Sequence, residues 1–344
     1  MKSIASAPGK IILFGEHFVV HGTKAILAAI DKRVTVTTTV TETRTLTGIL
    51  KINSQLGTFE IPMYDKEPYK EGISVEGHEW CLSMIKSEFR PFVYLIGKML
   101  DHVRLTSSVP LNFEYGGLEI TIDSDIPIGV GLGSSSACCV AATASISRLF
   151  GRKLLSERML EMSIEAERTI FPNTSGADCT VCTYGGMIEY PSIEKIDNTF
   201  DLNLLIANSM IPHNTKNSVE KVNKFKENDE ERFSQLCDLE NGLIDEVIIA
   251  MKNNDATTLG LKMSENQKYL EEIQVSNDTL RAMINSLNEI SLGSKITGAG
   301  DGGCIIALVE DENMDKVPAL LPKDKECFSA KIDTKGVVWS TIEE

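Results

Sequence analysis

The sequence predicts an α+β protein of two domains. Its 344 residues exceed the usual size of a single domain. Both halves of the chain combine strand-like runs with helix-like runs, which favours two mixed domains. The chain turns polar at residues 191–198, so we expect an N-terminal domain over residues 1–192 and a C-terminal domain over residues 193–344.

The N-terminal half is expected to alternate between strands and helices. Serines begin the small-residue run at residues 134–151 and Gly151 ends it, as is typical of a capped helix. Two further helices are expected at residues 82–104 and 155–170. β-Branched or alternating residues predict strands at residues 26–41, at residues 118–123 and at the end of the segment 172–190, which reads CTVCTYGGMIEY.

The C-terminal half is expected to place strands around a long helical region. A strand is predicted at residues 202–209, and the Glu-, Lys-, Asn- and Leu-rich residues 214–292 predict several helices. The glycine-rich segment 295–309 follows, and two more strands are expected near residues 327–333 and 336–340.

The chain is strongly acidic. It carries 34 basic and 49 acidic residues, which gives a net charge of −15. Such a surface repels the phosphates of nucleic acids, and no basic amphipathic stretch is present that would hold an anionic membrane. We therefore exclude nucleic acid and membranes as partners. An anionic small molecule would need local attraction from backbone amides, a metal ion or a few cations.

Eight cysteines occur, several of them in apolar surroundings, as expected for free, buried thiols in a reducing compartment. Cys179 and Cys182 form a CxxC pair without a second pair or a histidine cluster, which argues against a zinc site. The N-terminus lacks the apolar core of a signal peptide, and no stretch approaches the ~20 apolar residues that span a bilayer. These features predict a cytoplasmic protein.

A glycine-rich segment, SDIPIGVGLGSSSA, leads into the helix expected at residues 134–151. Glycines let a backbone approach a ligand closely, and the N-terminus of a helix offers free N–H groups to phosphate. The segment lacks the Gly-Lys-Ser/Thr of a Walker A loop. From these residues alone, a phosphate-binding loop and a glycine turn with a serine cap explain the pattern equally well.

Residues 298–303 read GAGDGG and match the GxGxxG pattern of dinucleotide-binding folds. Those folds place a helix after the glycines, whereas the strand-like CIIALV follows here. We therefore expect a glycine hairpin that packs against another part of the protein. A third segment lies near the N-terminus, where a strand-like run separates Lys10 from Glu16 and His17; each of these residues, taken singly, is best interpreted as a surface charge.

Together, and in this order along the chain, the three segments resemble the GHMP kinases, a family of small-molecule kinases. The middle segment is similar to their phosphate loop, Pro-x-x-x-Gly-Leu-Gly-Ser-Ser, and the last to their C-terminal glycine motif. The resemblance covers nearly the whole chain. It implies an N-terminal domain like ribosomal protein S5, a C-terminal ferredoxin-like α/β sandwich, and transfer of the γ-phosphate of ATP to a hydroxyl group in the presence of Mg²⁺.

Within this family, residues 7–22 (APGKIILFGEHFVVHG) are most similar to the opening of the enzymes that phosphorylate mevalonate at its 5-hydroxyl. Galactokinases share Gly-Glu-His but tend to continue differently. Glu167-Arg168 and residues 175–178 resemble the metal-binding glutamate and the catalytic aspartate, and residues 213–216 resemble an Asn-Thr-Lys segment. The resemblance thus implies mevalonate and ATP as ligands and is compatible with a homodimer.

The resemblance also implies a role for each matching residue. Asp178 would face the acceptor hydroxyl with Lys10 beside it, and Ser135 and Glu167 would hold Mg²⁺. The substrate pocket would be lined by Glu16, His17, Ile170 and Thr215. The nucleotide would be held by the two glycine motifs and the adjoining serines, at Gly129, Gly131, Leu132, Gly133, Ser134, Ser136, Gly298 and Gly300.

The chemistry of Asp178 follows from the weak basicity of a carboxylate. Removing the proton of an alcohol before phosphoryl transfer would be uphill by about 16 kcal/mol. We therefore expect Asp178 first to orient the hydroxyl and then to accept its proton late in the transfer.

Two positions depart from the family pattern. Asp301 stands where the mevalonate-phosphorylating enzymes usually have glycine, and it would bring a carboxylate near the nucleotide. Ala177 and Cys179 differ from the usual neighbours of the aspartate, which leaves the acceptor less defined than the reaction type. The alternatives are a sibling kinase acting on phosphomevalonate or on another hydroxyl of mevalonate, a non-catalytic sensor of the same fold, and a related decarboxylase.

Overall fold

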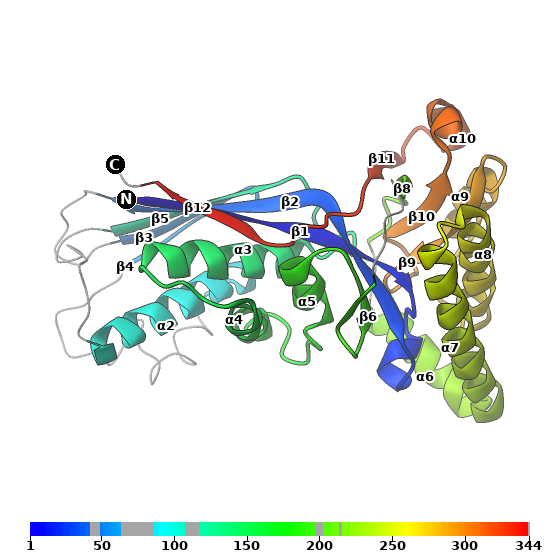
Figure 1. Cartoon of the computed structure of the whole chain (residues 1–344), viewed down its shortest axis with the longest axis horizontal. Coiled ribbons are helices and arrows are strands. Elements are labelled where there is room, and N and C mark those ends of the chain that lie inside the picture. The colour runs from blue at the N-terminus through cyan, green and yellow to red at the C-terminus, as the bar shows by residue number, and fades with distance from the viewer. Residues whose placement is uncertain (42–48, 63–84, 107–116, 197–201, 213–214, 343–344) are drawn as a thin grey trace.

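The computed structural model describes residues 1–41, 49–62, 85–106, 117–196, 202–212 and 215–342. Two β-sheets organise these residues, and helices pack against each sheet (Figure 1). The first sheet lies among the helices of the N-terminal half, and the second lies beside the long helices of the C-terminal half. The predicted fold class, α+β with two mixed parts, is confirmed.

The first sheet is built on two long antiparallel strands, β1 (Lys2–Phe14) and β2 (Ala25–Thr41). Its strand order is β12-β1-β2-β5-β3-β4, and β6 and β7 continue from β2. The β-branched residues of β2 suit a pleated surface, and they bury Val34 and Val36 in the core. The other strands are β3 (Ile49–Ser54), β4 (Gly57–Pro62), β5 (Gly117–Ser124), β6 (Met187–Tyr190), β7 (Glu194–Ile196) and β12 (Val338–Ile342).

Helices cover one face of this sheet (Figure 1). They are α2 (Arg90–Thr106), α3 (Ser134–Leu149), α4 (Ser156–Arg168) and α5 (Ala177–Tyr184). The small residues of α3 let its backbone lie close to β1 and β2, and its buried Ser145 hydroxyl bonds Thr38 Oγ1 at 2.8 Å and Ser3 O at 3.1 Å. These contacts tie the C-terminal part of α3 to β1 and β2.

The second sheet has the strand order β11-β8-β10-β9, with every pair antiparallel. Counted along the chain this order is 4-1-3-2, which is the topology of the expected ferredoxin-like sandwich. Its strands are β8 (Leu204–Asn208), β9 (Ser291–Thr297), β10 (Cys304–Val309) and β11 (Glu326–Ala330). The helices of this half are α6 (Thr215–Asn228), α7 (Glu230–Lys252), α8 (Ala256–Glu272), α9 (Asp278–Leu287) and α10 (Val317–Leu320).

Three short 3₁₀ helices complete the described elements: η1 (Phe18–His21), η2 (Ser87–Phe89) and η3 (Asp311–Lys316). The helix expected at residues 82–104 begins at Arg90 after η2, and residues 82–84 lie outside the described residues.

The segment CTVCTY is a helix, which corrects the prediction of a strand. Its Thr and Val residues favour strands, but Gly176 (φ +79°) begins α5 and Gly185 (φ +66°) ends it. The hairpin of β3 and β4, closed at Gly57, was not predicted. The last strand, β12, pairs with β1, so the chain returns to the first sheet after completing the second (Figure 1). The domain limits 1–192 and 193–344 stay a prediction.

The seven described cysteines are free, and Cys81 lies outside the described residues. Burial raises the pKa of the Cys139, Cys179 and Cys182 thiols, which makes them poor nucleophiles. Within the described part of the chain, no helix is long and apolar enough to cross a membrane. The same residues contain no group of three or more His, Cys, Asp or Glu side chains that could hold a metal ion.

Candidate active site

A cavity of about 860 Å³ collects residues from both halves of the chain. Its walls include parts of β1, the turn between β3 and β4, η2 with the start of α2, the loop between β5 and α3, the segment between α4 and α5, the start of α6 and the loop after β9. Most of the predicted site residues line it: Lys10, Gly129, Gly131, Leu132, Gly133, Ser134, Ser135, Ser136, Glu167, Ile170, Asp178, Thr215 and Gly298. Glu16, His17 and Gly300 lie elsewhere.

The loop between β5 and α3 is shaped by glycines with left-handed backbones. Gly129, Gly131 and Gly133 have φ angles of +76°, +86° and +72°. Gly133 is the N-cap of α3, and a Cβ atom there would lie 2.7 Å from Cγ of Lys10. The loop is tied to β1 because the Lys10 N–H donates to Leu132 O at 2.9 Å. The helix therefore begins at the cavity wall, where its free N–H groups attract an anion.

A salt bridge crosses the cavity between β1 and α5. Lys10 Nζ lies 3.1 Å from Asp178 Oδ2; the lysine side chain is 6% exposed and the aspartate side chain 35%. Asp178 lies in the first turn of α5, and the start of that helix is fixed by Gly176, where a Cβ atom would lie 2.5 Å from Cδ1 of Ile164. The ammonium is therefore nearly enclosed, while the carboxylate keeps an edge that a ligand can reach.

Glu167 lies in the last turn of α4 and is 2% exposed. Its carboxylate accepts hydrogen bonds from Ser136 Oγ and from Thr174 Oγ1, the latter at 2.6 Å. Ser135, the predicted partner of Glu167 at the metal, lines the cavity one residue before Ser136. Thr174 had no role in the prediction, and a threonine in a loop offers no sequence signal that would have singled it out.

The loop between β9 and β10 is the glycine hairpin that the sequence predicts, since Thr297 pairs with Cys304 across it. Its glycines allow close backbone contacts. A Cβ atom at Gly300 would lie 2.1 Å from Val275 O, and one at Gly302 would lie 2.6 Å from Ile211 O. Gly300, predicted to contact the nucleotide, packs against Val275 and does not line the cavity, whereas Gly298 and Ala299 do.

His17 supports this loop rather than lining the cavity itself. Its Nε2 lies 2.8 Å from the carbonyl oxygen of Ala299, so Nε2 carries the hydrogen that is donated. Burial lowers the pKa of His17, so the ring is neutral near pH 7. Because Ala299 lines the cavity, His17 acts on a ligand through the loop. His213 and Asn214, part of the predicted Asn-Thr-Lys segment, lie outside the described residues.

Glu16, predicted to contact the substrate, is buried against Lys295 of β9, and neither side chain has any exposed surface. Lys295 Nζ also donates to Ile296 O at 2.7 Å. Burial raises the pKa of Glu16 and lowers that of Lys295, and the attraction between the two groups opposes both shifts. The pair joins the end of β1 to the second sheet; Glu16 does not line the cavity, and its contact with a substrate stays a prediction.

Asp301, the departure from the family pattern, does not line the cavity. Its carboxylate lies 2.7 Å from Lys221 Nζ of α6, and its side chain is 15% exposed. The backbone of Asp301 is left-handed, with a φ angle of +56°. The extra negative charge is therefore compensated by a lysine outside the cavity lining.

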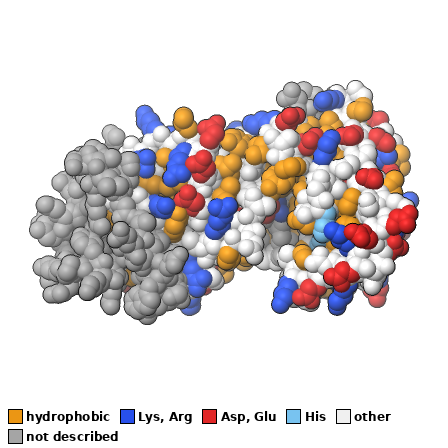
Figure 2. Space-filling view, turned by 90° about the horizontal axis from the view of Figure 1, so that it is seen from below, with side chains coloured by type: hydrophobic (Ala, Val, Ile, Leu, Met, Phe, Trp, Pro, Cys, Tyr) orange, Lys and Arg blue, Asp and Glu red, His pale blue; other side chains and the backbone are white. Residues whose placement is uncertain are grey.

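The charge of the cavity contrasts with that of the outer surface. On the face in Figure 2, basic and acidic side chains of the described residues are interspersed. Among the described residues that line the cavity, Lys10 is the one cationic side chain, whereas three carboxylates line it, those of Glu88, Glu167 and Asp178. A polyanionic ligand here would depend on backbone amides and an added cation.

Two family models match the chain. The GHMP kinase N-terminal domain matches residues 95–186, and the GHMP kinase C-terminal model matches residues 247–319. The mevalonate kinase of Thermococcus sibiricus is 32% identical over 347 aligned positions, which cover 98% of this chain and 98% of that protein. The chain belongs to the GHMP kinase family. As a GHMP kinase it is an enzyme of the kinase class, and this class uses ATP as phosphate donor.

Solved structures agree with this GHMP kinase fold. The crystal structure of the Methanococcus jannaschii mevalonate kinase is 25% identical, with a TM-score of 0.79, and the match covers 96% of this chain and 98% of that chain. The L. major mevalonate kinase, solved in complex with R-mevalonate, has a TM-score of 0.76 at 24% identity, over 96% of this chain and 95% of that chain. The second match bears on the fold alone.

Proposed function

We propose that this GHMP kinase transfers the γ-phosphate of ATP to the 5-hydroxyl of mevalonate. The observation that carries the proposal is the Lys10–Asp178 pair, which lies in one cavity with the glycine loop and the N-terminus of α3. The full-length similarity to curated mevalonate kinases supports mevalonate as the acceptor. The free, mostly buried cysteines suit a reducing compartment, and we place the reaction in the cytoplasm.

The cavity offers separate regions for the parts of ATP. The β5–α3 loop and the first turn of α3 supply N–H groups and a partial positive charge for the phosphates. Leu56, Phe89 and Phe92 form an apolar part of the lining, and this surface suits the base. The hydroxyl acceptor then lies on the side of Asp178, Ile170 and Thr215.

The donor atoms near α3 fit a magnesium ion. Glu167 supplies a buried carboxylate, Ser135 supplies a hydroxyl at the cavity wall, and oxygen ligands of this kind suit Mg²⁺ together with phosphate oxygens. Three carboxylates against one ammonium also leave the lining short of positive charge for a triphosphate. When bound, the ion would offset charge on the phosphate oxygens.

Asp178 and Lys10 carry out the chemistry on the acceptor. Asp178 accepts a hydrogen bond from the 5-hydroxyl and thereby orients the hydroxyl oxygen toward the γ-phosphorus. The new O–P bond forms as the bond from the γ-phosphorus to the bridging oxygen breaks, and the hydroxyl proton passes late to the Asp178 carboxylate. Lys10, 3.1 Å from Asp178, holds this carboxylate in place and offsets charge on the transferred group.

The test is an ADP-release assay with ATP, Mg²⁺ and a panel that holds mevalonate, phosphomevalonate and other small alcohols. ADP release with mevalonate, and a product whose ³¹P signal couples to the C5 protons, would support the proposal. Phosphorylation at another hydroxyl, or turnover only with phosphomevalonate, would favour the sibling kinase. ATP binding without turnover of any alcohol would favour the sensor, and release of CO₂ would favour the decarboxylase.

A further inference from the structure

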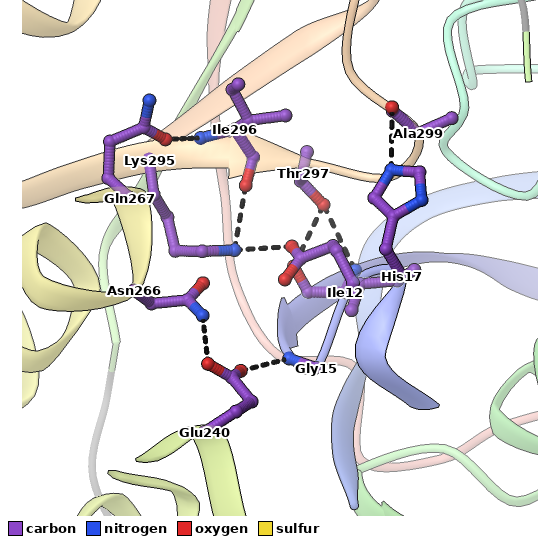
Figure 3. A network of polar contacts seen from close by, with 11 residues as sticks. Ile12, Gly15, His17, Glu240, Asn266, Gln267, Lys295, Ile296, Thr297 and Ala299 are labelled. Carbon is purple, nitrogen blue, oxygen red and sulfur yellow. Dashed lines mark hydrogen bonds and ion pairs between the residues drawn. The ribbon is translucent and has the colours of Figure 1, made fainter. Parts of the chain in front are cut away.

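A buried polar cluster lies where the end of β1 meets the second sheet and its helices (Figure 3). At its centre is Glu240 of α7, whose Oε1 accepts the Gly15 N–H at 2.8 Å and whose Oε2 accepts Asn266 Nδ2 at 2.6 Å. Glu240 and Asn266 have no exposed surface. The mechanism above uses neither residue. Burying a carboxylate costs free energy, so its presence here calls for an explanation.

The bond from Glu240 holds a tight turn that requires glycine. Gly15 has a φ angle of +96°, and a Cβ atom there would lie 2.5 Å from Lys24 O, so the turn has no room for a side chain. The next two residues point into the second half of the chain, with Glu16 on Lys295 and His17 on the Ala299 carbonyl. The placement of residues 15–17 against the glycine hairpin therefore depends on the anchor at Gly15.

The Glu240 side chain can accept the Gly15 N–H whether its carboxyl group is ionised or protonated. Burial, together with the nearby Glu16 carboxylate, raises the pKa of Glu240 to about 7, and Lys295 opposes this shift. Asn266 Oδ1 has no hydrogen-bond partner among the described residues. If Glu240 gains a proton, a flip of the Asn266 amide lets Oδ1 accept that proton's hydrogen bond, and Oε1 stays available to Gly15.

The nucleotide side of the cavity is held by different contacts. The glycine loop before α3 is bonded to Lys10 N, and Gly9 allows it to lie on β1, since a Cβ atom there would lie 2.9 Å from Leu132 O. None of these contacts involves α7 or α8. A loss of the Gly15 anchor should therefore disturb the cavity wall near Ala299 more than the phosphate loop.

We propose that Glu240 is a positioning residue for phosphoryl transfer, which fixes the acceptor side of the cavity through Gly15, His17 and Ala299. The inference rests on the proposed function, because the acceptor side is defined by it. It assigns to α7 and α8, which line no part of the cavity among the described residues, a direct influence on acceptor binding.

The test combines kinetics with hydrogen exchange on Glu240→Ala, Glu240→Gln and Asn266→Ala. A matched control is Glu246→Ala, on the same helix, where the carboxylate is 60% exposed and pairs with Lys262. In Glu240→Ala we expect the amide of Gly15 to exchange faster and the KM for mevalonate to rise about tenfold, with the KM for ATP within about twofold. Glu240→Gln keeps an acceptor for Gly15 and should restore both values, and Glu246→Ala should match the wild type.

Several outcomes would overturn the inference. One is a folded Glu240→Ala protein with faster exchange at Gly15 and unchanged KM for mevalonate; another is an equal rise in both KM values. If Glu240→Ala does not fold, Asn266→Ala must show the same split, and failure of both to fold assigns the cluster to stability alone. If the wild type does not turn over mevalonate, the proposed function fails, whereas the exchange rate at Gly15 still decides whether Glu240 holds the turn.

Discussion

Two ion pairs start from the same N-terminal segment and meet different surroundings. Lys10 of β1 pairs with Asp178, and that carboxylate is 35% exposed at the cavity. Six residues later, Glu16 pairs with Lys295, and both are fully buried between the two halves of the chain. The first pair can exchange its partner for a ligand, because water and substrate reach it. The second cannot, because either charge alone would be left without solvent or partner. We call Lys10–Asp178 the open pair, which suits chemistry, and Glu16–Lys295 the closed pair, which holds the two halves of the chain together.

The largest expected effect is on the open pair. Asp178→Asn keeps the size of the side chain but removes the proton acceptor, so kcat should fall about 10²- to 10⁴-fold. ATP affinity and the urea midpoint of unfolding should stay close to those of the wild type, since the side chain is partly exposed. Steady-state assays and a titration with a fluorescent ATP analogue measure these quantities. Near-normal turnover in this variant would remove Asp178 from the mechanism.

The closed pair should respond in stability. Lys295→Met leaves two buried carboxyl groups, Glu16 and Glu240, without their cation, and the free energy of unfolding should fall by about 3–5 kcal/mol. Lys10→Met is the matched comparison, since its partner is partly solvated, and it should lose about 1 kcal/mol or less. Urea unfolding followed by circular dichroism gives both values. Equal losses would end the distinction between the two pairs.

The buried cluster around Glu240 should also affect how stability depends on pH. The pKa of Glu240 is raised from 4.5 to about 7, so the folded state binds this proton more tightly than the unfolded state. The stabilisation is complete below about pH 4.5 and is lost as the pH rises through about 7. Glu240→Gln does not titrate, so its stability relative to the wild type should increase by about 3 kcal/mol over that range. A difference that stays flat from pH 4.5 to pH 8 would contradict the raised pKa.

The smallest expected effect concerns the packing of the glycine loop against Lys10 of the open pair. Gly133→Ala places a methyl group in a left-handed residue against Lys10, whereas Gly151→Ala has the same φ angle of +72° with no atom within 4 Å of the new Cβ. Both should lose about 1–2 kcal/mol of stability from backbone strain. Only Gly133→Ala should also lower kcat, by up to about 10²-fold, through displacement of Lys10. The same kcat in both variants would mean that the loop does not position the lysine.

The sequence alone predicts the features that depend on residues close together in the chain. The glycine hairpin at residues 298–303 followed from the strand after it, and the start of α3 followed from its serines and glycines. α5 was assigned to a strand because Thr and Val outweighed the flanking glycines. The contact between Lys10 and Asp178 came from family resemblance, since no periodicity links residues so far apart.

The buried cluster around Glu240 and Lys295 could not have been predicted from the sequence. Lys295 and Glu16 are separated by 279 positions, and Gly15 and Glu240 by 225. Glu240 lies on a helix with several exposed acidic residues, and only the tertiary fold makes it different from them. Glu16 was placed at the substrate because its neighbours in the chain match the family, whereas burial against Lys295 decides where its side chain lies.

The pairing of β12 with β1 bears on how the chain is made. During synthesis, β1 is made well before β12, and the whole second sheet lies between them in the chain. Until β12 has been made, the N–H and C=O groups of Lys2–Ser6 that will pair with it are open to other strands. A truncation just before β12 would therefore leave a nearly complete fold with those groups unpaired, and we expect a greater tendency to aggregate.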